Sequence, residues 1–231
     1  LQNAASVEIR METATVKTIE QQEIQMLHRY RESLVHDRTA LGNRIRGYLR
    51  ESGLFLVVGL SQVRKQVPLL LEDAGNELTF EMREIISSCH QKLLCLDEEI
   101  ARYTQKIERF CKENPVCERL MELAGVGPMI ASIVFATMGS PSNFKNGRHF
   151  SAFLGLVPKE HSSGGKHCLM SISKRGDRYI RSLVIHGGRA VVKNAGKKTD
   201  YLSCWVQRVH KERGFNKAAV AVANKNARHM W

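Results

Sequence analysis

The chain has 231 residues, of which 43% are hydrophobic and 25% charged, the ordinary balance of a globular protein with one domain or two small ones. It has no run of 18 or more apolar residues and no secretory leader, so we expect neither a membrane span nor export, and we place the protein in the cytoplasm with reduced thiols. The six cysteines lack CxxC spacing and the histidines lack the spacing of metal ligands, which argues against a zinc site.

The charge is distributed unevenly along the chain. Residues 1–115 hold 16 Lys and Arg against 17 Asp and Glu, whereas residues 116–231 hold 19 against 6, giving net charges of −1 and +13. Such asymmetry predicts two functional parts, the second of which faces a polyanion. A basic surface that merely aids solubility is the alternative. Nucleic acid is favoured because the cations accompany a phosphate-binding motif.

A long helix is predicted near the start of the chain. Residues 1–17 show no clean apolar period, and because the chain opens on Leu1 rather than Met, we interpret them as the remnant of an upstream domain in a longer protein. From Thr18 to about Gly53, apolar residues recur mainly at steps of three and four, which predicts one helix of unusual length.

A heptad row of apolar residues predicts a second long helix. The row alternates steps of four and three and comprises Met82, Ile86, Cys89, Leu93, Leu96, Ile100, Tyr103, Ile107 and Phe110. Pro115 ends it, and Pro68 is expected to open a short helix in the connection. Residues 18–115 are therefore predicted to form an antiparallel coiled-coil hairpin. A homodimer through this seam is favoured over purely internal pairing, because a lone hairpin leaves much of the seam in water. Asp97 to Glu99 are interpreted as a solvated helix face.

Residues 116–231 are predicted to form a compact basic helical domain, so the whole chain is expected to be mainly α. Helices are predicted at 116–124, 128–138, 147–154, 176–194, 199–212 and 216–230. A Gly/Ser/Lys loop spans 158–171, and Cys168 to Ser173 has the pattern of a short strand. Trp205 and Trp231 are expected in the core.

The first motif of this domain is a helix-hairpin-helix pattern at residues 120–134. One predicted helix ends at Ala124, the chain turns through Gly125 and Gly127, and the next helix begins at Pro128. Two glycines permit a tight turn with exposed amides, which together with the positive end of the next helix can bind a DNA phosphate. An ordinary packing turn is the alternative, and the surrounding positive charge favours nucleic acid.

The second motif is the loop that contains Ser162, Ser163 and Lys166. Small flexible residues beside a cation allow a phosphate to approach closely, and a serine hydroxyl becomes a nucleophile when the phosphorus is activated. Lys166 would stabilise the developing charge. Taken alone, this local sequence favours a solvent-exposed turn.

The third motif is a group of cations around a predicted helix start. Asp177 or Gly176 can cap the helix. Four cations surround this cap and make a candidate phosphate-contact face, namely Lys174, Arg175, Arg178 and Arg181.

Together these segments resemble a known family. Residues 120–139, 144–167 and 172–191 are similar to the C-terminal domain of bacterial insertion-sequence transposases of the one-ten/eleven-eleven group, which are DEDD transposases related to Piv-type DNA invertases. Residues 16–53 also resemble the entrance to the coiled coil of this group. The similarity covers about residue 15 to the end, and the three C-terminal motifs are specific in combination.

The resemblance implies a mechanism. In this family, an N-terminal RuvC-like domain supplies four acidic residues that hold a divalent metal such as Mg²⁺, and a serine of the C-terminal domain attacks DNA to form a phosphoserine link. The coiled coil mediates dimer assembly. Several members use a structured bridge RNA as guide. The loop matches the serine region, so Ser163 is the first choice of nucleophile and Ser162 stays open. No residue of this chain matches the acidic tetrad, so we expect a transposase truncated at its N-terminus, inactive alone and without its own metal.

These inferences predict a DNA transposase or site-specific recombinase that binds DNA in the bacterial cytoplasm at the nucleoid. A second interpretation is a non-catalytic helix-hairpin-helix module that binds DNA or structured nucleic acid. An upstream RuvC-like segment in the same reading frame would distinguish the two.

Overall fold

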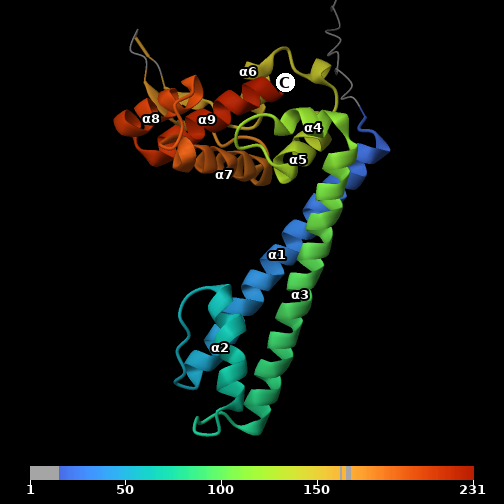
Figure 1. The fold of residues 1–231 in the computed structure, drawn as a ribbon, viewed down its shortest axis with the longest axis vertical. Coiled ribbons are helices and arrows are strands. Elements are labelled where there is room, and N and C mark those ends of the chain that lie inside the picture. The colour runs from blue at the N-terminus through green and yellow to red at the C-terminus, as the bar shows by residue number, and fades with distance from the viewer. Residues whose placement is uncertain (1–15, 162, 165–167) are drawn as a thin grey trace, which may run out of the picture. The chain divides into compact units, whose positions relative to one another are not determined.

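The computed structural model describes residues 16–161, 163–164 and 168–231, which are mainly helical, as predicted (Figure 1). The chain divides into two compact units. Ile24–Asn114 form one, which we call the three-helix unit. Residues 16–23 and Pro115–Trp231 belong to the other, which we call the basic unit. Among the described residues, no helix is long and apolar enough to span a bilayer.

The three-helix unit contains α1 (Ile19–Glu51, whose first turn belongs to the basic unit), α2 (Leu60–Glu72) and α3 (Phe80–Glu113). Thr79 caps α3, because its side chain accepts a hydrogen bond from the Met82 amide. Arg31 on α1 bonds Thr104 on α3, whereas Ser52, just after α1, bonds Met82. The earlier residue of α1 is thus bonded to the later residue of α3, and the reverse holds at the other end. The two helices are therefore antiparallel, and Figure 1 shows them side by side.

One heptad row of α3 is fully enclosed, and the other is not. The enclosed row is Ile86, Leu93, Ile100 and Ile107, all at most 6% exposed. The other predicted seam row stays half-buried or exposed and comprises Met82, Cys89, Leu96, Tyr103 and Phe110. Part of this row still packs within the unit, since Cys89 and Leu96 lie against its core and the Tyr103 ring meets the Tyr30 ring of α1. The residues one position later are also buried or half-buried, namely His90, Asp97, Thr104 and Cys111. The buried face of α3 is thus shifted from the predicted seam toward these residues.

The prediction that Pro68 opens a helix is wrong. Pro68 lies inside α2, which begins at Leu60. A proline in a helix interior loses one hydrogen bond, but Val63 and Val67 are both completely buried. The missing bond and the crowding of the preceding turn together cost about 3 kcal/mol. Burial of the two valines, at about 1.5–3 kcal/mol each, offsets that cost.

The interpretation of Asp97 as a solvated residue is also wrong. Its carboxylate is 24% exposed and accepts hydrogen bonds from Arg38 on α1 and Arg64 on α2. Burial alone would raise the pKa of Asp97, but the bonds from Arg64 and then Arg38 outweigh it, so the pKa lies below its ordinary value. One carboxylate therefore joins all three helices.

The basic unit is built from six short helices, a single 3₁₀ turn and a two-stranded hairpin within the described residues. These are α4 (Pro115–Met121), α5 (Pro128–Met138), η1 (Pro141–Asn143), α6 (Gly147–Phe153), β1 (Pro158–Glu160), β2 (Leu169–Ile172), α7 (Arg178–Ala195), α8 (Tyr201–Arg213) and α9 (Phe215–Met230). Five of these helices lie within two residues of their predicted bounds. The helix α4 ends three residues before Ala124, because Glu122 and Leu123 already make tighter turn-type bonds to residues three positions back.

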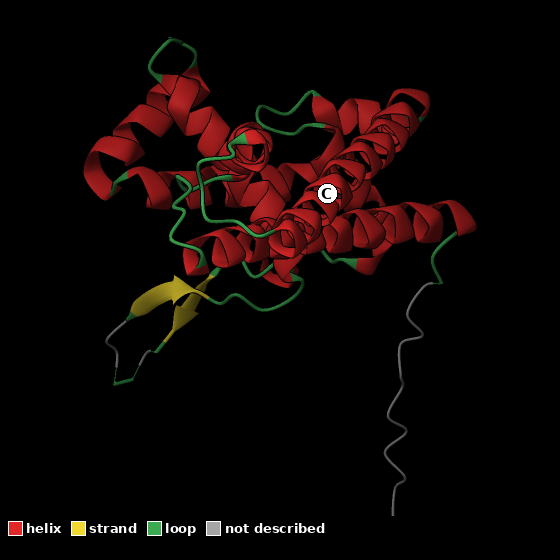
Figure 2. Cartoon of the chain, turned by 90° about the horizontal axis from the view of Figure 1, so that it is seen from below, coloured by secondary structure: helices red, strands yellow, loops and turns green. Residues whose placement is uncertain are grey.

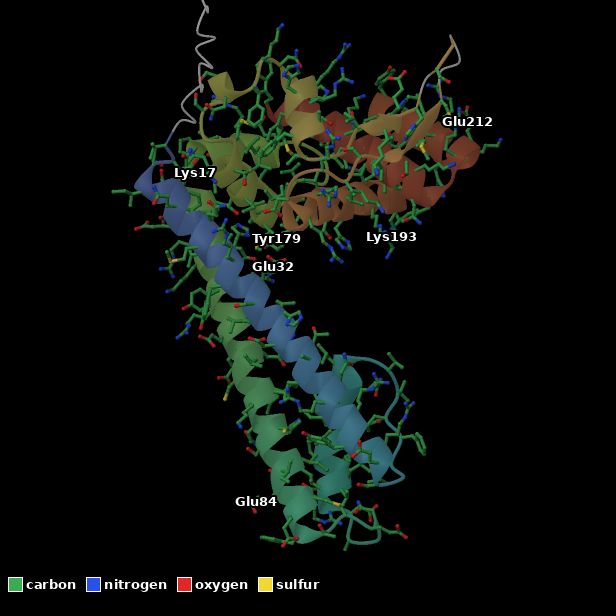
Figure 3. All side chains as sticks on the ribbon, turned by 180° about the vertical axis from the view of Figure 1, so that it is seen from behind. Lys17, Glu32, Glu84, Tyr179, Lys193 and Glu212 are labelled. Carbon is green, nitrogen blue, oxygen red and sulfur yellow. The ribbon has the colours of Figure 1, made fainter. Side chains whose placement is uncertain are left out.

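The core of this unit lies where α7, α8 and α9 meet. Small side chains of α9, including Ala218 and Ala219, allow close packing against Val192 of α7 and Val206 of α8. Lys193 on α7 and Glu212 on α8 point outward into solvent (Figure 3). The prediction that both tryptophans are core residues holds only in part. Trp205 is half-buried and packs against this core. Trp231 does not, since it is 43% exposed, with its indole N–H donating to the Pro141 carbonyl.

Candidate nucleic-acid interface

The serine loop stands on a tight crossing of two chain segments. The Ser173 amide donates to the Val157 carbonyl at 2.8 Å, and the Lys174 amide donates to the Gly155 carbonyl at 3.2 Å. Gly155 has φ +71°, and a Cβ there would collide with the backbone of Arg175. Only glycine fits this position without strain. The crossing fixes the base of the hairpin from which β1 and β2 emerge.

Arg181 locks this crossing from the interior. Its side chain is 9% exposed, and its terminal nitrogen donates to the Arg175 carbonyl at 2.9 Å, with longer bonds to the carbonyls of Leu154, Gly176 and Asp177. A guanidinium that is this deeply buried and held by backbone carbonyls offers little surface to a phosphate. Arg181, a predicted DNA contact, therefore lies where its first role is to hold the hairpin base.

Ser163 lies on the exposed arm beyond the crossing. β1 and β2 pair antiparallel, with Pro158 opposite Ile172 and Glu160 opposite Leu169. The strands project from the helices of their unit (Figure 2). Ser163 is exposed, and Gly164 after it turns in the left-handed region with φ +57°. Two other predicted site residues, Ser162 and Lys166, lie outside the described residues.

Three of the predicted cations follow directly after β2. Lys174, Arg175 and Arg178 are all exposed. As predicted, Asp177 caps α7, because its carboxylate accepts hydrogen bonds from the amides of Tyr179 and Ile180. That carboxylate is thus occupied by the backbone, and the three cations stand around the amino end of α7, where the helix dipole adds further positive potential.

The two glycines of the predicted helix-hairpin-helix have different surroundings. Gly125 has φ +82°, and a Cβ there would collide with the Gly187 carbonyl and the Val191 side chain of α7. Gly127 precedes α5 in an extended conformation, and a Cβ added there would have no other atom within 4 Å. Gly125 is therefore required for packing, and Gly127 is the glycine open to a ligand.

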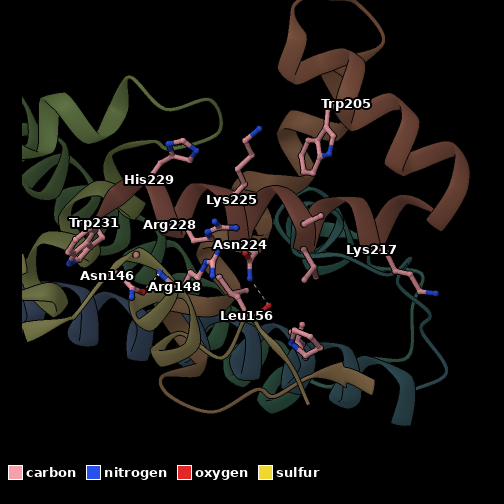
Figure 4. A pocket seen from close by; sticks show the side chains of 15 residues that line it. Asn146, Arg148, Leu156, Trp205, Lys217, Asn224, Lys225, Arg228, His229 and Trp231 are labelled. Atoms are coloured by element: carbon pink, nitrogen blue, oxygen red, sulfur yellow. Dashed lines mark hydrogen bonds between the residues drawn. The ribbon is translucent and has the colours of Figure 1, made fainter. Parts of the chain in front are cut away.

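A further basic surface, not predicted from the sequence, lies along α9. A groove with a cavity volume of about 940 Å³ carries Arg148 of α6 together with Lys217, Lys225 and Arg228 of α9 (Figure 4). Its wall includes Trp205 of α8. The available signal was the composition of α9, whose 16 residues include no Asp or Glu.

Comparison with known proteins identifies the family. Residues 117–202 match the family described as "Transposase IS116/IS110/IS902 family". The chain is 42% identical over 93% of its length to the transposase for insertion sequence element IS1111A of Coxiella burnetii. The chain belongs to this transposase family.

Two further relatives agree with this family. A probable family 20 transposase of Pseudomonas aeruginosa is 41% identical over 96% of the chain, and the transposase for insertion sequence element IS1328 of Yersinia enterocolitica is 30% identical over 96%. The chain spans 59%, 66% and 65% of the lengths of the Coxiella, Pseudomonas and Yersinia proteins.

The described part of this transposase chain does not fit the metal centre that the sequence resemblance implies. Among residues 16–161, 163–164 and 168–231, no three His, Cys, Asp or Glu side chains lie close enough together to hold an ion. Near the hairpin, the Asp177 carboxylate is bound to two amides. Asp177 is therefore not available as a metal ligand beside the hairpin.

Proposed function

We propose that this chain is the DNA-binding, serine-bearing part of an insertion-sequence transposase. The family sets the class of reaction. One structural observation supports the residue assignment, namely that exposed Ser163 stands on a hairpin whose second strand leads directly into exposed Lys174, Arg175 and Arg178. A DNA backbone held by these cations would present its phosphates to the same arm.

The proposed chemistry is a transesterification. The Ser163 Oγ forms a bond to a DNA phosphorus, the bond from that phosphorus to the bridging strand oxygen breaks, and the serine proton passes to the leaving oxygen, which becomes a free hydroxyl end. One phosphate ester replaces another, so the strand can be rejoined by the reverse step. Ser162 remains the alternative nucleophile.

Divalent metal, in this proposal, would be held by acidic residues outside this chain, in the RuvC-like domain that the sequence resemblance implies. It would activate the phosphodiester when bound. The residues of this chain position the DNA strand and supply the hydroxyl, which is why we expect the chain alone to bind DNA without cutting it.

A second copy of the chain is the proposed protein partner. The half-exposed row on α3, which includes Leu96 and Tyr103, is called the outer row. It repeats every seven residues, and such a row can pair with its equivalent on another α3 as a coiled coil. The enclosed row ending at Ile107 supplies most of the packing within one chain, and the inner sides of Leu96 and Tyr103 add to it. The exposed sides of the outer row are left for a partner.

DNA binding is tested with the whole chain and a labelled duplex, by fluorescence anisotropy at several salt concentrations. We expect affinity to fall steeply with salt, and each of Lys174→Gln, Arg175→Gln and Arg178→Gln to reduce the salt slope by about 1. Arg109→Gln, an exposed substitution of equal charge on α3, is the control. Equal effects of Arg109→Gln and the three hairpin variants would contradict this interface.

The nucleophile is tested by joining the chain to the segments of the Coxiella relative that the match leaves uncovered, and measuring strand exchange. Ser163→Ala should abolish exchange and leave duplex affinity unchanged, since one hydroxyl adds little to many phosphate contacts. Loss of strand exchange with Ser162→Ala but not with Ser163→Ala would identify Ser162 as the nucleophile. Normal exchange by the double variant would mean that the loop is a phosphate grip or a plain turn and that the serine mechanism does not apply to this protein.

A further inference from the structure

We propose that the groove along α9 binds an unpaired DNA strand, at a site separate from the hairpin cations. We call it the α9 groove, and it is lined by α6, the hairpin base, α8 and α9. Its volume of about 940 Å³ lies at the upper end of the range for ligand-binding clefts. The choice of DNA as the strand rests on the proposed function, while the groove itself is argued from its own residues.

The charge of the α9 groove points to a polyanion. Arg148, Lys217, Lys225 and Arg228 line it, and no Asp or Glu is among its lining residues. None of these cations is ion-paired with a carboxylate in the part of the chain that the structure describes. Four cations of like charge in one groove repel each other, and the phosphates of a nucleic acid would relieve that repulsion.

The spacing of the cations suits a strand rather than a single phosphate. Lys217, Lys225 and Arg228 lie on the groove side of one continuous helix. From Lys217 to Arg228 the helix rises by roughly 16 Å, at about 1.5 Å per residue. That length corresponds to roughly four or five stacked nucleotides at about 3.4 Å each. A free nucleotide would leave most of these cations unused.

Aromatic side chains beside these cations favour unpaired bases. Tyr201 and Trp205 lie one turn apart on α8, and the Lys225 ammonium lies 5.6 Å from the Tyr201 ring centre and 4.8 Å from the Trp205 ring centre. Tyr201 is 83% exposed. In a duplex the base faces are already stacked and paired, whereas in a single strand they can stack on such rings. The open Tyr201 ring, with the half-buried Trp205 beside it and Lys225 between them, therefore favours a single strand over a duplex.

The groove adjoins the arm that carries Ser163. Pro158 of β1 and Ile172 of β2, which are opposite each other at the hairpin base, both line the α9 groove. The Leu156 carbonyl, just before β1, accepts a hydrogen bond from the Asn224 side chain of α9 at 3.1 Å (Figure 4). A strand held in the groove would thus be anchored beside the hairpin. This continuity is the reason to assign DNA, the substrate of the proposed reaction, rather than RNA.

The test compares a labelled 12-nucleotide oligothymidylate with a 12-base-pair duplex, using the whole chain. We expect Lys217→Gln combined with Lys225→Gln to weaken oligothymidylate binding about tenfold or more. The matched control is Lys193→Gln combined with Lys211→Gln, which removes the same charge from exposed positions outside the groove. It should affect both ligands weakly and equally. Circular dichroism checks that every variant is folded.

Tyr201→Ala tests stacking without a change in charge. We expect it to weaken oligothymidylate binding roughly fivefold or more, as loss of one base–aromatic stack would, and to leave duplex binding unchanged. If the groove variants lose no more affinity than the control, the groove proposal is wrong while the proposed function stands. Tighter binding of oligouridylate than of oligothymidylate, with the same sensitivity to the groove variants, would overturn the assignment of DNA. A wild-type chain that binds neither ligand would overturn the proposed function as well.

Discussion

The carboxylate of Asp97 on α3 accepts two hydrogen bonds from the guanidinium of Arg64 on α2, at 2.6 and 2.7 Å. This two-point geometry is the strong form of an Arg–carboxylate pair. Arg38 on α1 adds a third bond at 3.0 Å. Because Asp97 and Arg64 are both at least two-thirds buried, water screens the pair less than it screens a pair on the surface.

A double-mutant cycle measures this pair. Asp97→Ala should lower the free energy of unfolding by about 1.5–3 kcal/mol, since it leaves half-buried cations without their partner. Arg64→Ala should cost a similar amount, and the two effects should be coupled by about 1 kcal/mol or more in urea denaturation. Arg102 and Glu99 form a more exposed pair on α3 and serve as control, with expected coupling below about 0.5 kcal/mol. Additive effects of the Asp97 and Arg64 variants would contradict the role of this pair.

His28 should make the stability of the chain depend on pH. The side chain is completely buried on α1, and burial, followed by the nearby Arg31 charge, lowers its pKa to about 4. In the unfolded chain the pKa of this histidine is about 6.5. Between about pH 4 and pH 6.5, His28 is therefore protonated in the unfolded chain but not in the folded chain. The contribution of His28 is therefore fully present above about pH 6.5 and is lost as pH falls to about 4, a change on the order of 3 kcal/mol.

The measurement compares unfolding free energies at pH 7 and pH 4.5. His28→Gln should reduce the loss of stability between these two pH values, whatever its effect at pH 7. His36, on the same helix, is exposed, so His36→Gln should keep the wild-type loss. If wild type and His28→Gln lose the same amount of stability over this interval, His28 does not carry the dependence.

The helices could be predicted from the sequence because their signals are local. Apolar periodicity and caps such as Asp177 act within a few residues, and both α1 and α7 follow them closely. The buried face of α3 could not be predicted this way. The row that contains Leu96 is apolar at its heptad positions, whereas the neighbouring row, which contains Asp97, is mostly polar. Arg38 and Arg64 donate hydrogen bonds to Asp97 and so allow this polar row to face inward.

The candidate site also combines residues whose role is visible in the local sequence with residues whose role depends on the fold. The motif containing Lys174, Arg175 and Arg178 was visible because its cations are adjacent in sequence. Arg181 belongs to the same run, yet its carbonyl partners include Leu154, 27 residues away, so its burial depends on a crossing that no local pattern reveals. The α9 groove was missed for a related reason. Lys217 and Arg228 look like ordinary surface residues until the hairpin base and α8 are placed beside them.

Gly125 and Gly127 should respond differently to the same substitution. Gly125→Ala introduces a methyl that collides with the backbone of Gly187 and imposes a strained φ, so it should lower the free energy of unfolding by about 1–3 kcal/mol. Gly127→Ala places its methyl in open space and should cost at most about 1 kcal/mol. Duplex affinity should nevertheless fall with Gly127→Ala, because the methyl obstructs a phosphate at the start of α5. Thermal unfolding and anisotropy on both variants check this, and unchanged affinity of a folded Gly127→Ala would limit this turn to packing.

The two heptad rows of α3 should separate assembly from folding. Ile100 is 6% exposed within the chain, so Ile100→Lys buries a charge without a partner and should unfold the three-helix unit at a cost of several kcal/mol. Leu96 is half-buried in the outer row and packs partly against the core, and the aliphatic stem of a lysine can keep that contact while its ammonium extends into water. Leu96→Lys should therefore leave the helices folded but place two like charges across the proposed interface between copies. Sedimentation velocity should then show a dimer for the wild type and a monomer for Leu96→Lys, with unchanged helical circular dichroism.

Gln105→Lys supplies the matched control for this experiment. Gln105 is exposed on α3 and lies about half a helical turn from Leu96 around the axis, so the substitution adds the same charge away from the outer row. It should remain a dimer. A folded Leu96→Lys variant that still sediments as a dimer would mean that the copies associate through another surface. A wild-type chain that sediments as a monomer at micromolar concentration would mean that the outer row does not bring two copies together, because two exposed heptad seams would otherwise gain apolar burial on pairing.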